Sequence, residues 1–213
     1  MKKFKILFQP RAFLTTAYHK IDRIFDRTYG LDTFDRANPT PYLWLRRIRN
    51  ALRLSPTDSI LDVGCGSGRT LWYLSRGGQR ARGIELDPEL AARARKNVPN
   101  ATIEVVDATV AEFNGETLIY LANPFGFNSA VMLTFLRRLF DDVARHPRPV
   151  RLCYLHPLLD LSPIAQLKPL RSVKFLHTTA DIYQVEPSPM PLPQALRRHP
   201  TYCSEFYAGR GAD

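Results

Sequence analysis

Residues 60–69 read Ile60-Leu61-Asp62-Val63-Gly64-Cys65-Gly66-Ser67-Gly68-Arg69, an apolar stretch that runs into three alternating glycines. The apolar half predicts a buried strand, and the glycines predict a tight turn before a helix. A side chain at any of the three glycines would fill the space that a ligand must enter, or would demand a backbone angle that only glycine reaches at low cost. A strand, a glycine turn and a helix form the first half of a nucleotide-type site at the carboxyl edge of a parallel sheet.

The spacing of the glycines narrows the class of ligand. A dinucleotide fingerprint requires a glycine at the sixth position of the turn, where this chain has Arg69, so a nicotinamide-dependent enzyme is disfavoured. The pattern Asp-x-Gly-x-Gly-x-Gly resembles instead the first motif of class I S-adenosylmethionine-dependent methyltransferases. The resemblance implies that the cofactor S-adenosyl-L-methionine contacts Asp62, Gly64, Cys65, Gly66 and Gly68.

An acid follows at the spacing that a ribose contact requires. Glu85 ends a short strand, and Asp87-Pro88 predicts the N-cap and first turn of the next helix. An acid beside the glycine turn can accept hydrogen bonds from both ribose hydroxyls. The alternative role for Glu85 is that of a helix cap, but Asp87 is better placed for it. We therefore expect Glu85 and Leu86 to bind the cofactor.

Two more predicted strands end in residues that the same family uses. Residues 101–106 predict a strand ending at Asp107-Ala108, where class I methyltransferases often place an acid against the adenine amino group. Residues 117–122 predict a strand ending in the loop 123–127, where the resemblance places methyl transfer. These strand ends follow one another in the family's order, and the resemblance covers about residues 28–157.

Asn123 and Phe125 are the candidate catalytic residues. If the nucleophile is a nitrogen, a fixed carbonyl oxygen can accept its hydrogen bonds and turn its lone pair toward the methyl group. The loop Asn-Pro-Phe-Gly-Phe resembles the Asn-Pro-Pro-aromatic motif of nitrogen-directed methyltransferases without its second proline. It is equally similar to the Asn-Asn-Phe-Ala-Phe of non-SET (Dot1-like) lysine methyltransferases. The alternative is a turn that ends the strand and packs its phenylalanines in the core.

The resemblance to the lysine methyltransferases extends to a loop near the amino terminus. That family has Tyr-Gly-Glu-Thr in a loop that closes over the cofactor, and this chain has Tyr29-Gly30-Leu31-Asp32-Thr33, one residue longer. The resemblance implies that Tyr29 and Thr33 are lid residues that contact the cofactor.

The fold implied is an α/β, Rossmann-like class I methyltransferase fold. Its sheet has seven mostly parallel strands, with an antiparallel last strand and helices on both faces. Apolar periodicity predicts helices at 11–27, 42–54 and 129–145 and strands at 150–156, 172–176 and 180–185. In the second helix it places Leu43, Leu45, Ile48 and Leu52 against the core. We divide the chain into an N-terminal helical segment and cofactor lid (1–54), the cofactor-binding domain (55–186) and an irregular tail rich in proline and arginine (187–213).

Composition and charge set further bounds. The 213 residues are 45% hydrophobic and carry a net charge of +10, which would attract a polyanion such as nucleic acid. Arginine clusters are also what solvated helix faces look like, so a nucleic-acid partner stays open. Cys65, Cys153 and Cys203 lack metal-type spacing and are read as free thiols, and no metal site is predicted. The first ten residues are too short for a signal peptide or a membrane span, which predicts a cytoplasmic protein.

Two hypotheses about function follow. In the first, the chain is an S-adenosylmethionine-dependent methyltransferase acting on a nitrogen of a protein lysine, a nucleic-acid base or a small amine. In the second, it is a non-catalytic S-adenosylmethionine-binding module with an RNA- or protein-binding role. The polar and aromatic composition of the Asn123 loop favours catalysis. The methyl acceptor and the oligomeric state stay open.

Overall fold

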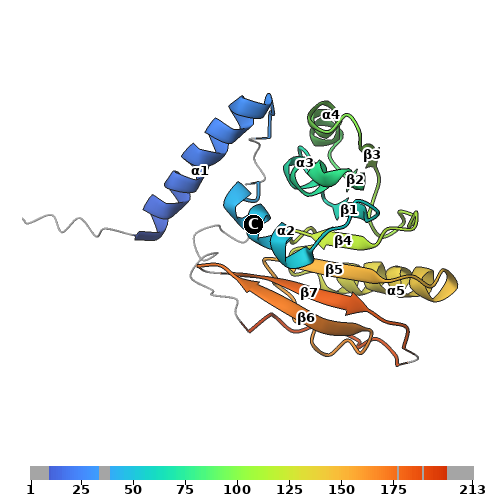
Figure 1. The fold of residues 1–213 in the computed structure, drawn as a ribbon. Coiled ribbons are helices and arrows are strands. Elements are labelled where there is room, and N and C mark those ends of the chain that lie inside the picture. The colour runs from blue at the N-terminus through green and yellow to red at the C-terminus, as the bar shows by residue number, and fades with distance from the viewer. Residues whose placement is uncertain (1–9, 34–38, 177, 189, 201–213) are drawn as a thin grey trace, which may run out of the picture.

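A computed structural model describes residues 10–33, 39–176, 178–188 and 190–200, with side chains from residue 18 onward (Figure 1). Seven strands form one sheet: β1 (Ser59–Val63), β2 (Arg80–Glu85), β3 (Thr102–Val105), β4 (Leu118–Leu121), β5 (Val150–Leu155), β6 (Leu167–Lys174) and β7 (Thr179–Val185). Their order across the sheet is β3-β2-β1-β4-β5-β7-β6. The first five strands in chain order pair in parallel, and β7 runs antiparallel to both β5 and β6. This topology confirms the predicted mostly parallel sheet with an antiparallel last strand.

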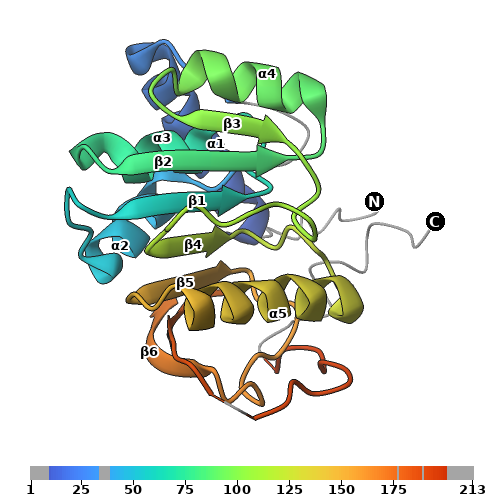
Figure 2. The same ribbon diagram turned by 90° about the vertical axis from the view of Figure 1, so that its right-hand side faces the viewer.

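The helices lie on both faces of this sheet, as predicted. They are α1 (Pro10–Tyr29), α2 (Tyr42–Leu52), α3 (Arg69–Leu74), α4 (Pro88–Asn97) and α5 (Ser129–Arg145), with a 3-10 turn at Ser75–Gly77. Figure 2 shows α5 in front of the sheet and α2 and α3 behind it. The central strands β1 and β4 are buried along their whole length, because both of their faces are covered.

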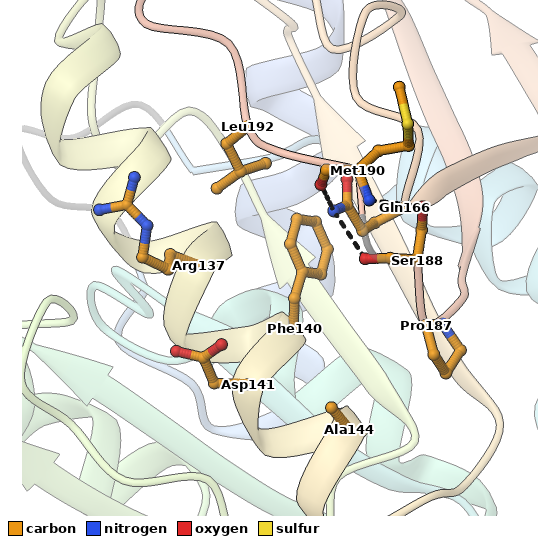
Figure 3. Close-up of a pocket in the computed structure, with 9 residues that line it drawn as sticks. All are labelled: Arg137, Phe140, Asp141, Ala144, Gln166, Pro187, Ser188, Met190 and Leu192. Carbon is orange, nitrogen blue, oxygen red and sulfur yellow. Dashed lines mark hydrogen bonds between the residues drawn. The ribbon is translucent and has the colours of Figure 1, made fainter.

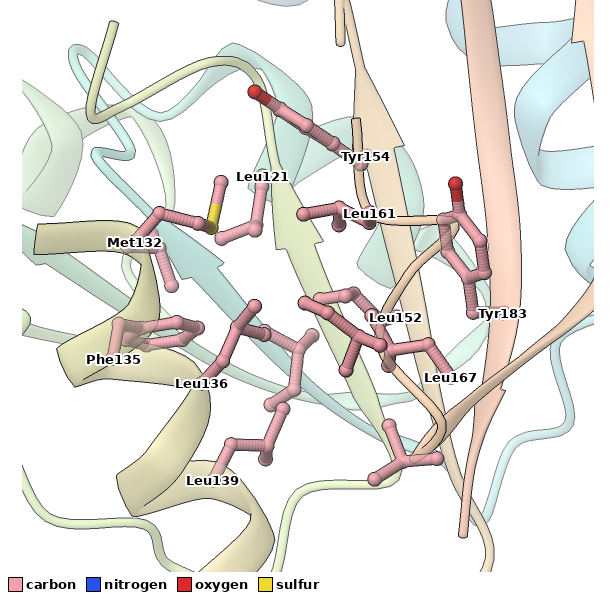
Figure 4. Close-up of a cluster of buried hydrophobic side chains, with 14 of the residues drawn as sticks. Leu121, Met132, Phe135, Leu136, Leu139, Leu152, Tyr154, Leu161, Leu167 and Tyr183 are labelled. Carbon is pink, nitrogen blue, oxygen red and sulfur yellow. The ribbon is translucent and has the colours of Figure 1, made fainter. Parts of the chain in front are cut away.

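Two hydrophobic clusters fill the space between the layers. On the α5 face, Met132, Phe135, Leu136 and Leu139 point at the side chains of β4 and β5 (Figure 4). On the other face, Trp44 and Ile48 of α2, Leu71 of α3 and Ala91 of α4 pack against Ile60, Leu118 and Tyr120. Burial of these side chains is the main term that stabilises the sheet.

The buried side of α2 differs from the prediction. Leu43 is 42% exposed, whereas Tyr42 and Trp44 are buried together with Leu45, Ile48 and Leu52. The difference comes from neighbours that are distant in sequence. The Tyr42 hydroxyl donates to Asp26 of α1 at 2.5 Å, and the Trp44 ring stacks on Phe175 with 4.5 Å between centroids.

The sixth strand also lies elsewhere than predicted, at 167–174 instead of 172–176. Residues 168–172 are all exposed, so this edge strand lacks the alternation of apolar residues on which the prediction depended. Pro169 is tolerated because the strand has a partner on one side only, and a register shift follows it.

The α5 face is covered partly by the segment at residues 190–200. Neither the connection between β3 and β4 nor the one between β5 and β6 contains a helix. Leu196 is 8% exposed and its backbone N–H donates to the Ser129 hydroxyl at 2.7 Å. The predicted irregular tail is thus free of helices over its described part, but it is packed into the core. Cys203 and the other residues after 200 lie outside the described part of the chain.

None of the helices that the structure describes is both long and apolar enough to cross a lipid bilayer.

The division of the chain at residues 54 and 186 stays a prediction. Side chains from all three predicted parts share the two hydrophobic clusters: Trp44 from the first, the sheet from the second, and Leu192 and Leu196 from the third.

Candidate functional site

The predicted site residues follow the carboxyl ends of neighbouring strands. Val63 at the end of β1 is in register with Ile84 of β2 and with Leu121 of β4. The glycine turn, Glu85 and the Asn123 loop therefore meet at one edge of the sheet. In parallel α/β sheets this edge is where ligands bind.

The glycine turn needs its glycines for two physical reasons. Gly64, Gly66 and Gly68 all adopt positive φ angles, of 70°, 53° and 86°. A Cβ atom at Gly64 would lie 3.0 Å from the Cβ of Pro124, and one at Gly68 would lie 3.0 Å from Val98 and 3.2 Å from Ala94 of α4. Glycine at 64 thus lets the turn approach the Asn123 loop, and glycine at 68 lets α3 pack closely on α4.

Glu85 is joined to the glycine turn by a hydrogen bond. Its Oε2 accepts from the backbone N–H of Gly66 at 2.8 Å, and its Oε1 accepts from the N–H groups of Leu86 and Asp87. Oε2 retains a lone pair for a further donor. Asp87 caps α4 by accepting from the N–H groups of Glu89 and Leu90, as the sequence predicted. Capping by Asp87 leaves Glu85 at the turn.

The predicted adenine side of the site is open to solvent. Leu86 is 66% exposed, and Asp107 is exposed while Ala108 beside it is buried. The Oδ1 atom of Asp107 accepts from the backbone N–H and the hydroxyl of Thr109, both at 2.7 Å, and these bonds lower the pKa of Asp107. Asp107 is therefore a carboxylate at neutral pH, and its second oxygen can accept a hydrogen bond from a donor such as an amino group.

Asp62 lies beneath the turn, 2% exposed, and its Oδ2 accepts no hydrogen bond from the described residues. Burial and, secondly, the charge of Glu85 raise the pKa of Asp62 to about 7. A buried polar atom without a partner costs about 1–3 kcal/mol, and such atoms in native proteins often face a ligand or water. An unpartnered carboxyl oxygen below a glycine turn fits a bound molecule that carries hydrogen-bond donors.

Cys65 packs inward. A Cβ atom at Gly83 would lie 2.7 Å from its sulfur, so the cysteine fills the space that Gly83 leaves open. Burial raises the pKa of the Cys65 thiol well above its usual range, which keeps it protonated and unreactive at neutral pH. Its backbone N–H donates to the oxygen of Ile84 in β2, and its thiol donates to the oxygen of Gly66 in the turn.

The Asn123 loop has a strained start. Asn123 adopts a φ of 57°, a left-handed conformation that non-glycine residues seldom adopt outside turns and functional sites. Its Oδ1 is buried and unpartnered among the described residues. A half-turn about the terminal torsion exchanges the oxygen and nitrogen of an amide, so this side chain can present its oxygen to a ligand.

The two phenylalanines of this loop differ in surroundings. Phe125 packs on Phe135 of α5, with 5.4 Å between the ring centroids, and so faces the core. Phe127 is 40% exposed, and the guanidinium of Arg198 lies over its ring at 4.8 Å. Phe127, which the sequence analysis did not select, is therefore the more exposed of the two rings.

His156 was also not selected from the sequence. It follows β5 directly, adopts a φ of 53°, and contacts the Trp44 ring at 5.3 Å. The sequence could have indicated His156 by its position at the end of a predicted strand, because the same position led to the selection of Asn123. We add His156 to the candidate site because it lies at the same edge of the sheet.

The two predicted lid residues lie in different places. Tyr29 packs on Trp72 of α3, with 5.0 Å between ring centroids, and under the guanidinium of Arg76. Thr33 is fully buried, and its backbone oxygen accepts from the hydroxyl of Ser67 in the glycine turn at 3.1 Å. Thr33 thus contacts the turn, whereas Tyr29 contacts the helix that follows it.

A cavity of about 500 Å³ lies elsewhere, between α5 and residues 187–192 (Figure 3). Phe140 forms its floor, and Arg137 and Asp141 stand beside it. Gln166 lines it at the start of β6, near the amino end of β5. The cavity is therefore at the opposite edge of the sheet from the glycine turn and contains none of the predicted site residues.

A comparison with models of protein families shows which kind of domain carries this edge of the sheet. Residues 60–149 match the model of a methyltransferase domain. The chain therefore contains a methyltransferase domain. The match begins at β1, includes the glycine turn, Glu85, Asp107 and Asn123, and ends just before β5. Residues 10–33 and α2, which pack against the methyltransferase domain, lie outside the match.

Two relatives carry similar sequences. A probable ribosomal RNA small subunit methyltransferase A of Methanosarcina mazei is 30% identical over 111 residues, which are 51% of this chain and 41% of the relative. An uncharacterised methyltransferase of Synechocystis is 39% identical over 51 residues, 24% of each chain. The chain thus spans less than half the length of the relatives that it matches.

Solved structures of methyltransferases share the fold. An RNA methyltransferase of Salinibacter ruber, crystallised with S-adenosyl-L-homocysteine, superposes with a TM-score of 0.59 at 23% identity, over 75% of this chain and 99% of that one. A TehB-like S-adenosylmethionine-dependent methyltransferase of Corynebacterium glutamicum has a TM-score of 0.55 at 18% identity, over 84% of this chain and all of the other. The Rossmann-like class I methyltransferase fold is thus confirmed. The resemblance of the Tyr29 and Asn123 loops to lysine methyltransferases stays a prediction.

Proposed function

We propose that the chain is an S-adenosylmethionine-dependent methyltransferase that transfers the methyl group to a nitrogen of an RNA base. The main support for the proposal is that the glycine turn and the loop that begins at Asn123 lie in contact within the matched domain. Pro124 approaches Gly64 so closely that a side chain there would touch it. A cofactor on the turn would therefore lie beside Asn123.

The residues present fit S-adenosylmethionine. Gly64, Gly66 and Gly68 leave backbone bare for its amino-acid part, and Asp62 holds an unpartnered carboxyl oxygen beneath them. Glu85 retains a lone pair on Oε2 for a ribose hydroxyl, and Asp107 with the exposed Leu86 borders the place for adenine. This assignment of cofactor roles follows from the resemblance and stays part of the proposal.

The chain itself supplies alignment and hydrogen bonds. S-adenosylmethionine, when bound, supplies an electrophilic methyl group, so little acid–base machinery is required of the protein. The carboxamide oxygen of Asn123 accepts a hydrogen bond from the acceptor nitrogen and directs its lone pair along the line of displacement. The same oxygen stabilises the positive charge that develops on the nitrogen. Phe125, packed on Phe135, supports the loop from the core side.

An RNA acceptor is supported by three observations. The Methanosarcina relative is named as a ribosomal RNA methyltransferase. The chain carries a net charge of +10, which favours a polyanion. Phe127 offers a partly exposed ring with an arginine over it beside Asn123, and aromatic and guanidinium faces are what unstacked RNA bases bind.

Transfer of a labelled methyl group tests this function. The full chain is incubated with labelled S-adenosylmethionine and separate pools of RNA, DNA and protein from a cell extract, and each pool is digested with nuclease or protease. We expect label in RNA, on a base nitrogen. Label in the protein pool would overturn the RNA acceptor, and no label in any pool would favour the non-catalytic module.

Asn123→Gly separates binding from turnover. Glycine accepts the φ of 57° that alanine would strain, so the substitution removes the carboxamide alone. We expect turnover to fall by about 100-fold or more, the loss typical of a deleted transition-state hydrogen bond. Calorimetry should find S-adenosylhomocysteine bound with unchanged affinity. Unchanged turnover in this variant would contradict the role of Asn123.

A further inference from the structure

A buried arginine follows the glycine turn directly. Arg69 is the first residue of α3 and is 2% exposed. Its guanidinium nitrogens lie 2.8 Å from Asp22 and 2.8 Å from Asp26, both on α1. Its Nε donates to the hydroxyl of Thr33 at 2.7 Å. The charged end of this side chain is thus directed at the segment that precedes the matched domain.

The two carboxylates that bind Arg69 also bind α2. Asp22 accepts from the backbone N–H of Tyr42 at 3.1 Å, and Asp26 accepts from the Tyr42 hydroxyl. The Thr33 hydroxyl donates to Asp26, so it bridges that carboxylate and Arg69. One buried cluster therefore joins α1, residue 33, the start of α2 and the start of α3. We call these five residues, Asp22, Asp26, Thr33, Tyr42 and Arg69, the Arg69 cluster.

A second set of hydrogen bonds fixes the same segment to the turn itself. The Ser67 hydroxyl donates to the Thr33 oxygen, and the side chain of Asn97 donates to the oxygens of Ser67 and Asp32, both at 2.8 Å. The N–H of Asp32 donates back to Asn97 at 3.0 Å. Thr33 is therefore bonded directly to Ser67, which lies between the glycines 66 and 68, and Asp32 is joined to Ser67 through Asn97.

Stability alone gives a poor account of this arrangement. A buried ion pair is often no more stabilising than well-packed apolar residues, because both charges lose their hydration. Meanwhile Ile21 and Ile24 of α1 stay 45% and 65% exposed. The helix thus buries two acids and leaves apolar side chains in water. The ionic cluster supplies a specific geometry. Phe25 of α1 also packs on the Tyr42 ring, but the two ion pairs with Arg69 fix the position of α1 relative to the start of α3.

We propose that Arg69 is a positioning residue through which the docking of α1 and of residues 32–33 preorganises the glycine turn for the cofactor. The inference rests on the proposed function, since it assumes that the turn binds S-adenosylmethionine. Coupling between two sites is reciprocal in free energy. Docking of α1 therefore strengthens cofactor binding, and cofactor binding stabilises the docked α1.

Arg69→Met tests the proposal, with Arg82→Met as the matched control. Arg82 is also buried, and it binds Glu116 at 2.7 Å and Glu104 at 3.1 Å, but these acids belong to β3 and the loop before β4. Calorimetry with S-adenosylhomocysteine is done on folded protein, checked by circular dichroism. We expect the dissociation constant of Arg69→Met to rise by about tenfold or more. The dissociation constant of Arg82→Met should stay within about twofold of the wild-type value. We expect the melting temperature to fall in both variants.

Hydrogen exchange supplies a readout that a purely structural role would not change. In the wild type, S-adenosylhomocysteine should slow amide exchange in residues 18–33, and in Arg69→Met this protection should vanish. Should Arg69→Met fail to fold, Thr33→Val removes only the bridging hydroxyl, and we expect its affinity for the same ligand to fall between the wild type and no binding.

The outcomes separate the inference from the function on which it rests. A wild type that does not bind S-adenosylhomocysteine would overturn both. A wild type that binds it, together with an Arg69→Met or Thr33→Val variant of equal affinity, would overturn the positioning role alone. Equal loss of affinity in Arg82→Met would also overturn it, because the effect would then follow from stability.

Discussion

At the scale of single residues, two of the buried polar side-chain atoms that lack a partner among the described residues lie at the carboxyl edge of the sheet. The Oδ2 of Asp62 and the Oδ1 of Asn123 accept no hydrogen bond from the part of the chain that the structure describes. Each such atom destabilises the folded chain by about 1–3 kcal/mol. Asp62 lies under the glycine turn and Asn123 opens the neighbouring loop. We interpret both atoms as acceptors whose donors arrive with the cofactor and the methyl acceptor.

Asp62 makes the stability of the ligand-free protein depend on pH. The pKa of Asp62 is about 7 in the folded chain and about 3.9 in an unfolded one, so the folded state binds this proton more tightly. The stabilisation from protonated Asp62 is complete below about pH 4 and is lost as the pH rises through 7. Asp62→Asn should remove this slope and raise the free energy of unfolding at pH 8, by at most about 4 kcal/mol.

Urea unfolding of wild type and Asp62→Asn at four pH values between 5 and 8 measures this effect. All other titrating groups are shared by the two proteins, so the difference between the curves isolates Asp62. A constant difference over the whole range would mean that Asp62 is already ionised in the folded protein at pH 5.

At the scale of elements, the irregular segment at residues 190–200 covers part of the α5 face of the sheet, where a helix could otherwise pack. Among the residues described after β5 none forms a helix that covers the α5 face, and Leu192 and Leu196 pack against the cluster there. The segment is fixed by backbone hydrogen bonds from Asp160 to Arg197 and from His199 to Leu158, and by the contact of His199 with Asp181. It also brings Arg198 over Phe127. An irregular segment thus completes the core and borders the acceptor side of the site.

Leu196→Ala should therefore destabilise the fold. Leu196 is 8% exposed, and removal of a buried leucine side chain costs about 2–5 kcal/mol. Leu176→Ala is the matched control, because Leu176 is 64% exposed and its loss should change stability by less than about 0.5 kcal/mol. Denaturant unfolding compares the two. Equal effects would show that the segment is not part of the folded core in solution.

At the scale of the whole molecule, the charge of +10 bears on the acceptor and not on the cofactor. Contacts to RNA phosphates release counterions, so affinity for RNA falls steeply with salt. The cofactor contacts proposed here are mostly hydrogen bonds to backbone and to single carboxylates, which salt affects little.

Salt titration should thus separate the two ligands. Between about 50 and 200 mM salt, we expect binding of single-stranded RNA, measured by fluorescence anisotropy, to weaken by about tenfold or more. Affinity for S-adenosylhomocysteine, measured by calorimetry at the same two concentrations, should change by less than about twofold. RNA binding that is weak and insensitive to salt would contradict the assignment of the basic surface to an RNA acceptor.

Much of the fold could be predicted because its signals are local. Asp87 caps the helix that begins at Pro88, since the cap and the helix are adjacent in sequence. The central strands are marked by continuous apolar runs, since both of their faces are covered. The sixth strand is held by pairing with β7 while the side chains of residues 168–172 stay exposed, so no apolar alternation marked it.

The candidate site, too, was predictable from the sequence only in part. Sequence alone determined the order of strand ends that gathers the glycine turn, Glu85, Asp107 and Asn123, because the parallel strands of one sheet all have their carboxyl ends at the same edge. Only the tertiary structure decided that Phe127 and not Phe125 is exposed, and that Arg69 joins Asp22 and Asp26 in a buried cluster. The acids stand 47 and 43 residues before Arg69, and contacts over such separations depend on how whole elements pack.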